Sequence, residues 1–260
     1  MFLKVIACEI AARELQHTAS CSKNLIDLEF LTQGHHDHPA SGRIEIQERI
    51  DHTPAGKYDA IVLGYALCSN ILTGLKATHT KLVVPRAHDC ITFFLGSKER
   101  YQQRFAERPG TYYFSSGWLE CAARRAQKGS MWSAAASPAN SPANVQATYQ
   151  QWVLKYGEDQ AKYLMTEMSR WSEVYSHGCL IDFDFLRELD LPNQVQRICS
   201  EKGWTYDKIP GDLSLFQKML DGEWSDSDFV IAQPGQRLVP TFDEHIIAAK
   251  DLPPPVQCPA

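Results

Sequence analysis

Three cysteines follow predicted β-strands, and one of them belongs to the triplet His88-Asp89-Cys90. Cys8, Cys68 and Cys90 come after the largely apolar segments 2–7, 58–64 and 81–85. In an open parallel sheet, residues just past the carboxyl ends of neighbouring strands border one crevice, where such folds bind ligands. Because thiolate and imidazole are ligands of soft metals, the first hypothesis is a soft-metal site at this edge.

The predicted metal ligands are Cys8, Cys68, His88 and Cys90. Zinc bound by cysteine and histidine takes about four ligands, with sulfur at about 2.3 Å and nitrogen at about 2.0 Å. Neighbouring strands lie about 4.8 Å apart, so side chains at their ends can reach this geometry. Because the sheet already holds the fold, a catalytic site with an open coordination position is favoured over a structural one.

Polar residues near these cysteines complete the predicted site. Glu9 could act as a general base or orient a metal ligand, and the planar guanidinium of Arg86 suits an anionic substrate group. Asn70 and His36, one in the loop after Cys68 and the other after the second strand, are predicted to bind substrate. His35 and His38 are expected to be surface residues. The alternatives are a surface salt bridge for Arg86 and a solvated turn for the whole cluster 35–38.

Predicted strands alternate with predicted helices along the chain. The strands are 2–7, 25–31, 58–64, 81–85, 111–115, 179–183, 204–209 and 229–232, and long helices are expected at 91–105 and 150–175. This alternation predicts an α/β fold with a parallel sheet and helices on both faces. Two α/β lobes are expected, at 1–128 and 147–260, because the stretch 129–146 is rich in Ser, Ala, Pro and Asn and is typical of a flexible loop or linker.

The composition indicates a soluble protein of the cytoplasm. Hydrophobic residues make up 44% and charged residues 22% of the chain, which is ordinary for a globular protein. The 26 basic and 31 acidic residues give a net charge of -5, which argues against a nucleic-acid partner. There is neither a secretory signal nor an apolar run of about 20 residues, so we expect no membrane association. Cytoplasmic thiols stay reduced, which favours ligands or nucleophiles over disulfides.

His88 and Cys90 are separated by one residue, and Cys121 follows at a distance. This pattern resembles that of zinc-dependent methyltransferases, which bind a substrate thiol as a thiolate. The resemblance implies transfer of a methyl or other alkyl group to a thiol whose pKa the metal has lowered. The alternative for Cys121 and Cys90 is a packing role, because free cysteine is often buried.

Five longer stretches of the chain are distinctive, namely VIACEIAARELQ, YDAIVLGYALCSN, LVVPRAHDCITFFLGSKERY, PGTYYFSSGWLE and GDLSLFQKMLDGEWSDSDFVIAQPGQ. They resemble sequences of the DUF1638 family. Cys8, Cys68, His88 and Cys90 fall within them. Members often accompany corrinoid proteins and corrinoid-dependent methyltransferases, so the resemblance implies a link with one-carbon metabolism. The family usually has a glycine-richer loop after Cys68, where this chain has Ser69 and Ile71.

The leading hypothesis is a zinc-like, metal-dependent transferase that acts on a small molecule by alkyl or methyl transfer. A second hypothesis is a non-catalytic accessory protein that hands a metal or a corrinoid to a methyltransferase partner. A third is a metal-free enzyme in which Cys90 is the nucleophile and His88 its base. In an extended strand these two side chains would share one face.

Overall fold

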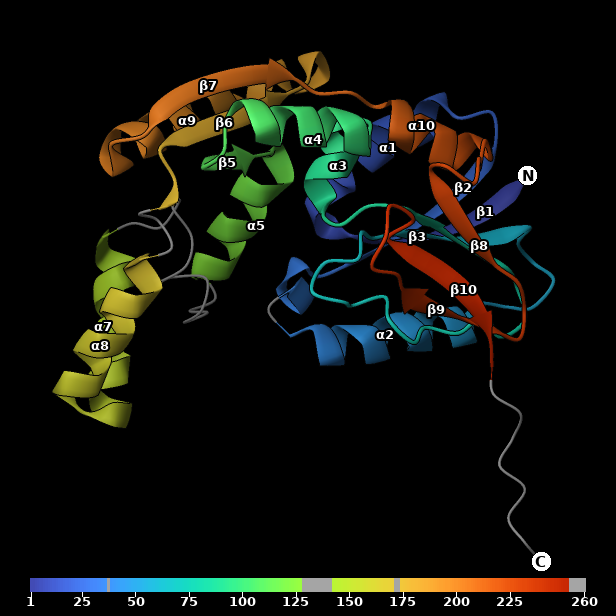
Figure 1. Ribbon diagram of the computed structural model, residues 1–260, viewed down its shortest axis with the longest axis horizontal. Coiled ribbons are helices and arrows are strands. Elements are labelled where there is room, and N and C mark those ends of the chain that lie inside the picture. The colour runs from blue at the N-terminus through green and yellow to red at the C-terminus, as the bar shows by residue number, and fades with distance from the viewer. Residues whose placement is uncertain (37, 128–141, 171–173, 253–260) are drawn as a thin grey trace, which may run out of the picture. The chain divides into compact units, whose positions relative to one another are not determined.

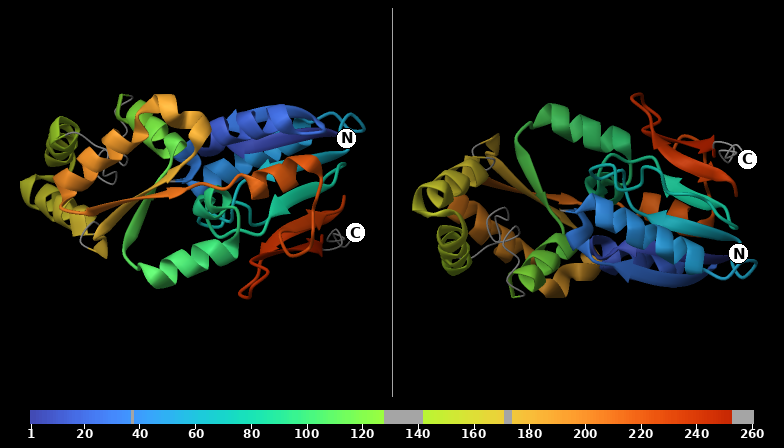
Figure 2. Two further views of the ribbon diagram at one scale, coloured as in Figure 1. Left: turned by 90° about the horizontal axis from the view of Figure 1, so that it is seen from above. Right: turned by 90° about the horizontal axis from the view of Figure 1, so that it is seen from below.

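Two compact units make up the chain in the computed structural model, which describes residues 1–36, 38–127, 142–170 and 174–252. Unit 1 comprises Met1–Lys98 and Leu213–Ala260, and unit 2 comprises Glu99–Asp212. The chain therefore leaves unit 1 and returns to it, so that its last strands lie with its first (Figures 1 and 2). The predicted lobe boundaries at 128 and 147 do not coincide with these units. Of the predicted linker, 129–141 lies outside the described residues and 142–146 begins a helix.

Unit 1 is built on a five-stranded sheet with the order β2-β1-β3-β4-β8. The strands are β1 (Phe2–Cys8), β2 (Leu25–Leu31), β3 (Ala60–Gly64), β4 (Leu82–Pro85) and β8 (Phe229–Ala232). The first four are parallel, and β8 is antiparallel to β4. Every residue of β3 and β4 is buried, which explains why their sequences are apolar without alternation.

The helices and strands that cover this sheet come from both ends of the chain. They are η1 (Glu9–Ala11), α1 (Ala12–Cys21), η2 (Gln33–His36), α2 (Pro39–His52), α3 (Cys90–Leu95), α10 (Ser214–Asp221), β9 (Gln236–Pro240) and β10 (Ile247–Asp251). The strands β9 and β10 form a separate antiparallel pair.

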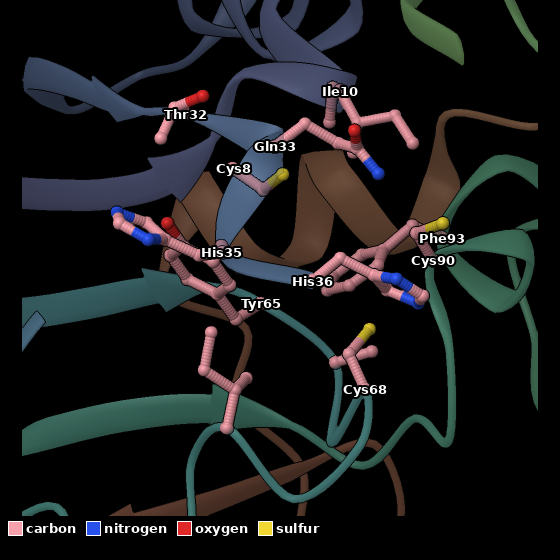
Figure 3. Close-up of a pocket in the computed structure, with 14 residues that line it drawn as sticks. Cys8, Ile10, Thr32, Gln33, His35, His36, Tyr65, Cys68, Cys90 and Phe93 are labelled. Atoms are coloured by element: carbon pink, nitrogen blue, oxygen red, sulfur yellow. The ribbon is translucent and has the colours of Figure 1, made fainter. Parts of the chain in front are cut away.

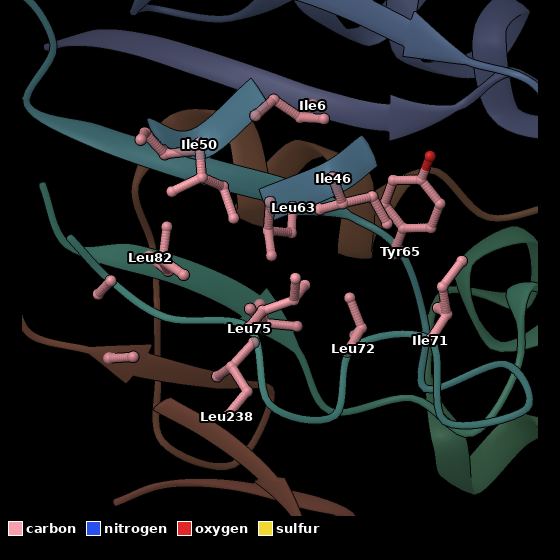
Figure 4. Packing of buried hydrophobic residues seen from close by; sticks show 14 of the residues in the cluster. Ile6, Ile46, Ile50, Leu63, Tyr65, Ile71, Leu72, Leu75, Leu82 and Leu238 are labelled. Carbon is pink, nitrogen blue, oxygen red and sulfur yellow. The ribbon is translucent and has the colours of Figure 1, made fainter. Parts of the chain in front are cut away.

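Both faces of the sheet are covered. On one face, Ile46 and Ile50 of α2 belong to a buried cluster with Leu63 and with Leu238 of β9 (Figure 4). Side chains alternate along a strand, so Gly64 faces the other way, and a Cβ there would lie 3.5 Å from Leu15 Cδ1 of α1. The helix α1 in turn packs against α10. The sheet is therefore a buried layer between two covering layers.

Unit 2 contains a smaller parallel sheet with the order β5-β6-β7. Its elements are α4 (Lys98–Glu107), β5 (Thr111–Phe114), α5 (Ser116–Gln127), α7 (Pro142–Tyr156), α8 (Glu158–Arg170), β6 (His177–Asp182), η4 (Asp184–Leu189), α9 (Leu191–Lys202) and β7 (Thr205–Pro210). The helix α9 packs on β6 and β7.

The predicted α/β class is confirmed, and the differences concern individual elements. The helix predicted over 150–175 is two helices, because Gly157 has a φ of +84° and ends α7. The helix predicted over 91–105 is likewise divided into α3 and α4. The pair β9–β10 and the antiparallel direction of β8 were not predicted. Within the described residues, no helix is long and apolar enough to cross a membrane.

Candidate functional site

A pocket in unit 1 lies past the carboxyl ends of β1 and β3. The strand β1 lies between β2 and β3, so the chain goes to one side of β1 to form β2 and to the other side to form β3. Ligands of doubly wound sheets bind at such a switch point. Cys8, Cys68 and Cys90 all line this pocket (Figure 3). The other polar side chains that line it are Thr32, Gln33, His35, His36 and Tyr65, and the larger apolar ones are Ile10, Ile71 and Phe93.

Glu9 joins the end of β1 to the segment that follows β2. Its carboxylate accepts hydrogen bonds from Thr32 Oγ1 at 3.2 Å and from the backbone N–H of Gln33 at 2.9 Å. Gln33 opens η2, so these bonds hold η2 against the strand end that carries Cys8. Glu9 is not one of the lining residues, and its described contacts are those of a positioning group rather than of the predicted general base.

The loop after β3 continues the parallel pairing with the segment after β4. The backbone N–H of Leu67 donates to Ala87 O at 2.9 Å, and that of Cys68 donates to His88 O at 3.0 Å. Cys68, Ser69 and Asn70 then have φ angles of +31°, +54° and +63°. Non-glycine residues in this region cost on the order of 1–3 kcal/mol each. The strained turn brings Ile71 back to the pocket wall.

Cys90 is the first residue of α3 rather than part of an extended strand. The side chain of Asp89 caps this helix by accepting from Ile91 N at 3.0 Å and from Thr92 N at 3.4 Å. The cap fixes the direction in which α3 starts. It also places a carboxylate next to the thiol of Cys90.

The electrostatic environment of the pocket favours uncharged thiols. Burial raises the pKa of Cys68 to about 12, and the carboxylate of Asp89 adds to this shift. Burial, followed by the neighbouring Cys68 and Asp89, raises the pKa of Cys90 well above its ordinary value. The pKa of Tyr65 is also raised, mainly by burial and then by Cys8 and Glu45. At neutral pH the thiols of Cys68 and Cys90 and the hydroxyl of Tyr65 therefore keep their protons.

Two histidines line the pocket, although only His36 was predicted to contribute. His36 is exposed at the pocket rim, whereas His35 is partly buried, with its Nε2 atom 2.7 Å from Glu45 Oε2. His35 approaches α2 closely, because a Cβ on Gly42 would lie 2.6 Å from His35 Cβ. The interpretation of His35 as a surface residue was therefore wrong. His38 is exposed.

His88, a predicted ligand and base, does not join the cysteines. Its side chain is exposed and is not among those that line the pocket. Because Cys90 begins a helix, the extended geometry that would have placed both side chains on one face is absent. Cys121, whose spacing completed the methyltransferase-like pattern, is buried in unit 2, where Arg124 Nη2 lies 3.2 Å from its sulfur.

Arg86 and Asn70 also differ from their predicted substrate-binding roles. The guanidinium of Arg86 is buried and donates to the carbonyls of Asp226, His245 and Ile247, and it pairs with Asp226 Oδ1 at 2.8 Å. Its hydrogen bonds therefore connect segments of unit 1. Asn70 is exposed outside the pocket, and its carbonyl accepts from Arg43 Nη2 at 2.9 Å.

Among the described residues, no three His, Cys, Asp or Glu side chains are arranged to hold a metal ion. The three thiols border the same pocket, but they do not converge on one point as zinc ligands would. The predicted ligand set is therefore brought together in part, with Cys8, Cys68 and Cys90 present and His88 outside.

Gln33 and Tyr65 are buried pocket residues that the sequence analysis missed. They are 3% and 5% exposed, and neither Gln33 Oε1 nor Tyr65 Oη has a hydrogen-bond partner within the described structure. Each lies one or two residues past the end of a strand, Gln33 after β2 and Tyr65 after β3. The strand-end rule that selected the cysteines would have found both residues, had it been applied to amide and phenol side chains.

Comparison with known proteins identifies a family but no characterised relative. A search of curated proteins and a search of solved structures each found no match. The model of the family described as "Protein of unknown function (DUF1638)" matches residues 30–220. This match covers most of the chain, including the loops that carry Cys68 and Cys90, and the chain therefore belongs to the DUF1638 family.

Proposed function

We propose that the pocket formed by Cys8, Cys68 and Cys90 binds a soft divalent metal such as zinc together with a small substrate, and that the protein is a metal-dependent transferase of methyl or other alkyl groups. The observation that carries the proposal is the placement of three thiols, from the ends of three parallel strands, around one pocket. Three protein ligands with a fourth position open to substrate are typical of catalytic zinc.

The electrostatics of the pocket support a cationic occupant. Burial and the nearby Asp89 carboxylate favour the protonated thiols of Cys68 and Cys90, and a metal ion would reverse that preference, because thiols bind metals as thiolates. A bound zinc ion would supply Lewis acidity and lower the pKa of a substrate thiol. Since the thiols do not already converge, binding requires their side chains to turn toward one another.

The same observations weigh against a metal-free mechanism. The raised pKa of Cys90 leaves little nucleophilic thiolate at neutral pH, and the exposed His88 lies outside the pocket. The link with a corrinoid protein or a methyltransferase partner follows from the family resemblance alone. It would make the protein either the transferase or an accessory that delivers a metal or corrinoid.

Zinc binding to the purified full-length chain tests the proposal. We expect about one zinc per chain by elemental analysis after equilibration, and marked loss of zinc in Cys8→Ser, Cys68→Ser and Cys90→Ser. Cys21→Ser is the matched control, because Cys21 is an exposed cysteine of the same unit outside the pocket. His88→Ala should also keep its zinc.

Wild-type protein that binds no zinc, or pocket variants that bind as much as Cys21→Ser, would refute the metal site. If zinc binds but thiol substrates are not alkylated in the presence of a methyl-corrinoid donor, the accessory function is favoured over the enzymatic one.

A further inference from the structure

Two buried polar atoms of the pocket have no hydrogen-bond partner in the described part of the chain. Tyr65 Oη and Gln33 Oε1 lack hydrogen-bond partners among the described residues, and both side chains are more than nine-tenths buried. Buried polar groups in proteins are almost always hydrogen-bonded, so each exception calls for an explanation. Because both residues line the same cavity, a ligand in that cavity could satisfy both.

The chemistry of the two groups defines what such a ligand must offer. The phenol hydroxyl of Tyr65 donates a hydrogen bond at neutral pH, because the pKa of a phenol is ordinarily about 10. The carboxamide oxygen of Gln33 accepts a hydrogen bond. The ligand therefore needs an acceptor for Tyr65 and a donor for Gln33.

The surroundings argue against an anionic ligand. The residues that line the cavity include no lysine or arginine within the described chain. In metal-free protein, a carboxylate or phosphate would be buried there without a permanent counter-charge, which is costly.

The size of the cavity favours a small ligand. Its volume is about 40 Å³, whereas pockets for drug-sized ligands have about 300–1,000 Å³. The apolar side chains of Ile10, Ile71 and Phe93 complete the wall. They would contact a methyl or short alkyl part.

We infer that the pocket takes a small uncharged molecule with a short alkyl part, an acceptor for the Tyr65 hydroxyl and a donor for the Gln33 carbonyl oxygen, as in a primary amide or an alcohol. The inference rests on the proposed function in placing the substrate in this pocket, but the two polar contacts do not require a metal. It assigns Tyr65 and Gln33 as substrate-binding residues.

Acetamide and acetate are matched probes, because they have the same size and a common methyl group but differ in charge and in the presence of a donor. We expect acetamide to shift the backbone NMR signals of Gln33, Tyr65 and Cys68 in ¹⁵N-labelled full-length protein, and acetate to shift them far less. Tyr65→Phe and Gln33→Met should each weaken acetamide binding about tenfold, the effect of about one lost hydrogen bond. The exposed Tyr163→Phe should bind as the wild type does.

Thermal melting separates a ligand role from a structural one. Because the Tyr65 hydroxyl has no hydrogen-bond partner in the part of the chain that the structure describes, Tyr65→Phe should melt at or above the wild-type temperature. A clear fall in melting temperature, equal shifts by acetate and acetamide, or undiminished acetamide binding by both variants would overturn the inference. Zinc content measured on the same samples separates the two proposals. If the protein binds acetamide but no zinc, only the proposed metal site fails. If it binds zinc but not acetamide, only the proposed ligand class fails.

Discussion

At the scale of single residues, the environment of each cysteine decides its reactivity more than its position in the sequence does. Cys90 begins a helix, a place where the backbone dipole commonly lowers a thiol pKa. Here the pKa is raised, first by burial and then by the neighbouring Cys68 and Asp89. Without a cation, the thiols of Cys68 and Cys90 are therefore neutral at neutral pH.

We expect iodoacetamide to label Cys21 well before Cys68 or Cys90 at pH 7. Cys21 is exposed, whereas a rise in pKa from about 8.5 to about 12 leaves Cys68 with less than about a thousandth of the ordinary thiolate fraction. Timed alkylation followed by peptide mass spectrometry measures the order. Labelling of Cys68 or Cys90 as fast as Cys21 would contradict the raised values.

The same shift predicts how stability depends on pH in metal-free protein. The folded state binds the Cys68 proton more tightly than the unfolded chain does, so the stabilising effect is complete below about pH 8.5. It should be lost as the pH rises from there toward about 12. Urea unfolding of wild type and Cys68→Ser across this range tests the sign, because the variant should lose less stability as the pH rises.

At the scale of elements, the wall of the pocket depends on how closely α2 approaches η2 and the loop after β3. A Cβ at Gly42 would lie 2.6 Å from His35 Cβ and 2.8 Å from Ile71 Cδ1, and both neighbours line the pocket. Glycine is therefore required at this point of α2 for packing, although it lowers helix propensity.

Gly42→Ala should lower the free energy of unfolding by about 1–3 kcal/mol through overpacking. The higher helix propensity of alanine should offset part of this loss. It should also perturb acetamide binding, because His35 and Ile71 must move. Urea unfolding measures the first effect and NMR titration the second. The control is Glu48→Ala, which places alanine at an exposed position of the same helix. If both variants behave alike, the close packing of α2 does not control the pocket.

At the scale of the whole molecule, unit 1 is assembled from segments far apart in the sequence. The return of 213–252 supplies α10, β8, β9 and β10. Arg86 connects the strand end after β4 with this segment through the carbonyls of Asp226, His245 and Ile247. This long-range role replaces the predicted contact with an anionic substrate.

Arg86→Met should lower stability by about 2–5 kcal/mol, because it leaves buried carbonyls without their charged donor. Zinc and acetamide binding by the folded variant should be unchanged. Urea unfolding and the two binding assays measure these effects. Arg187→Met, at an exposed ion pair with Glu188, is the control and should change stability by less than about 0.5 kcal/mol. Lost ligand binding with full stability would restore the substrate-binding role of Arg86.

The sequence alone determined the α/β class and placed Cys8, Cys68 and Cys90 at one edge of a parallel sheet, because apolar strand runs and their ends are local features. Only the tertiary structure decided which neighbouring side chains turn inward. The left-handed turn at Cys68–Asn70 follows the pairing of the loop after β3 with the segment after β4, and Cys90 begins a helix rather than continuing a strand, so spacing could not exclude His88. The strand ends lead to Gln33 and Tyr65, but only the tertiary structure shows that both side chains are buried. The discontinuous unit 1 was hidden for the same reason, since the pairing of β4 with β8 joins segments separated by the whole of unit 2.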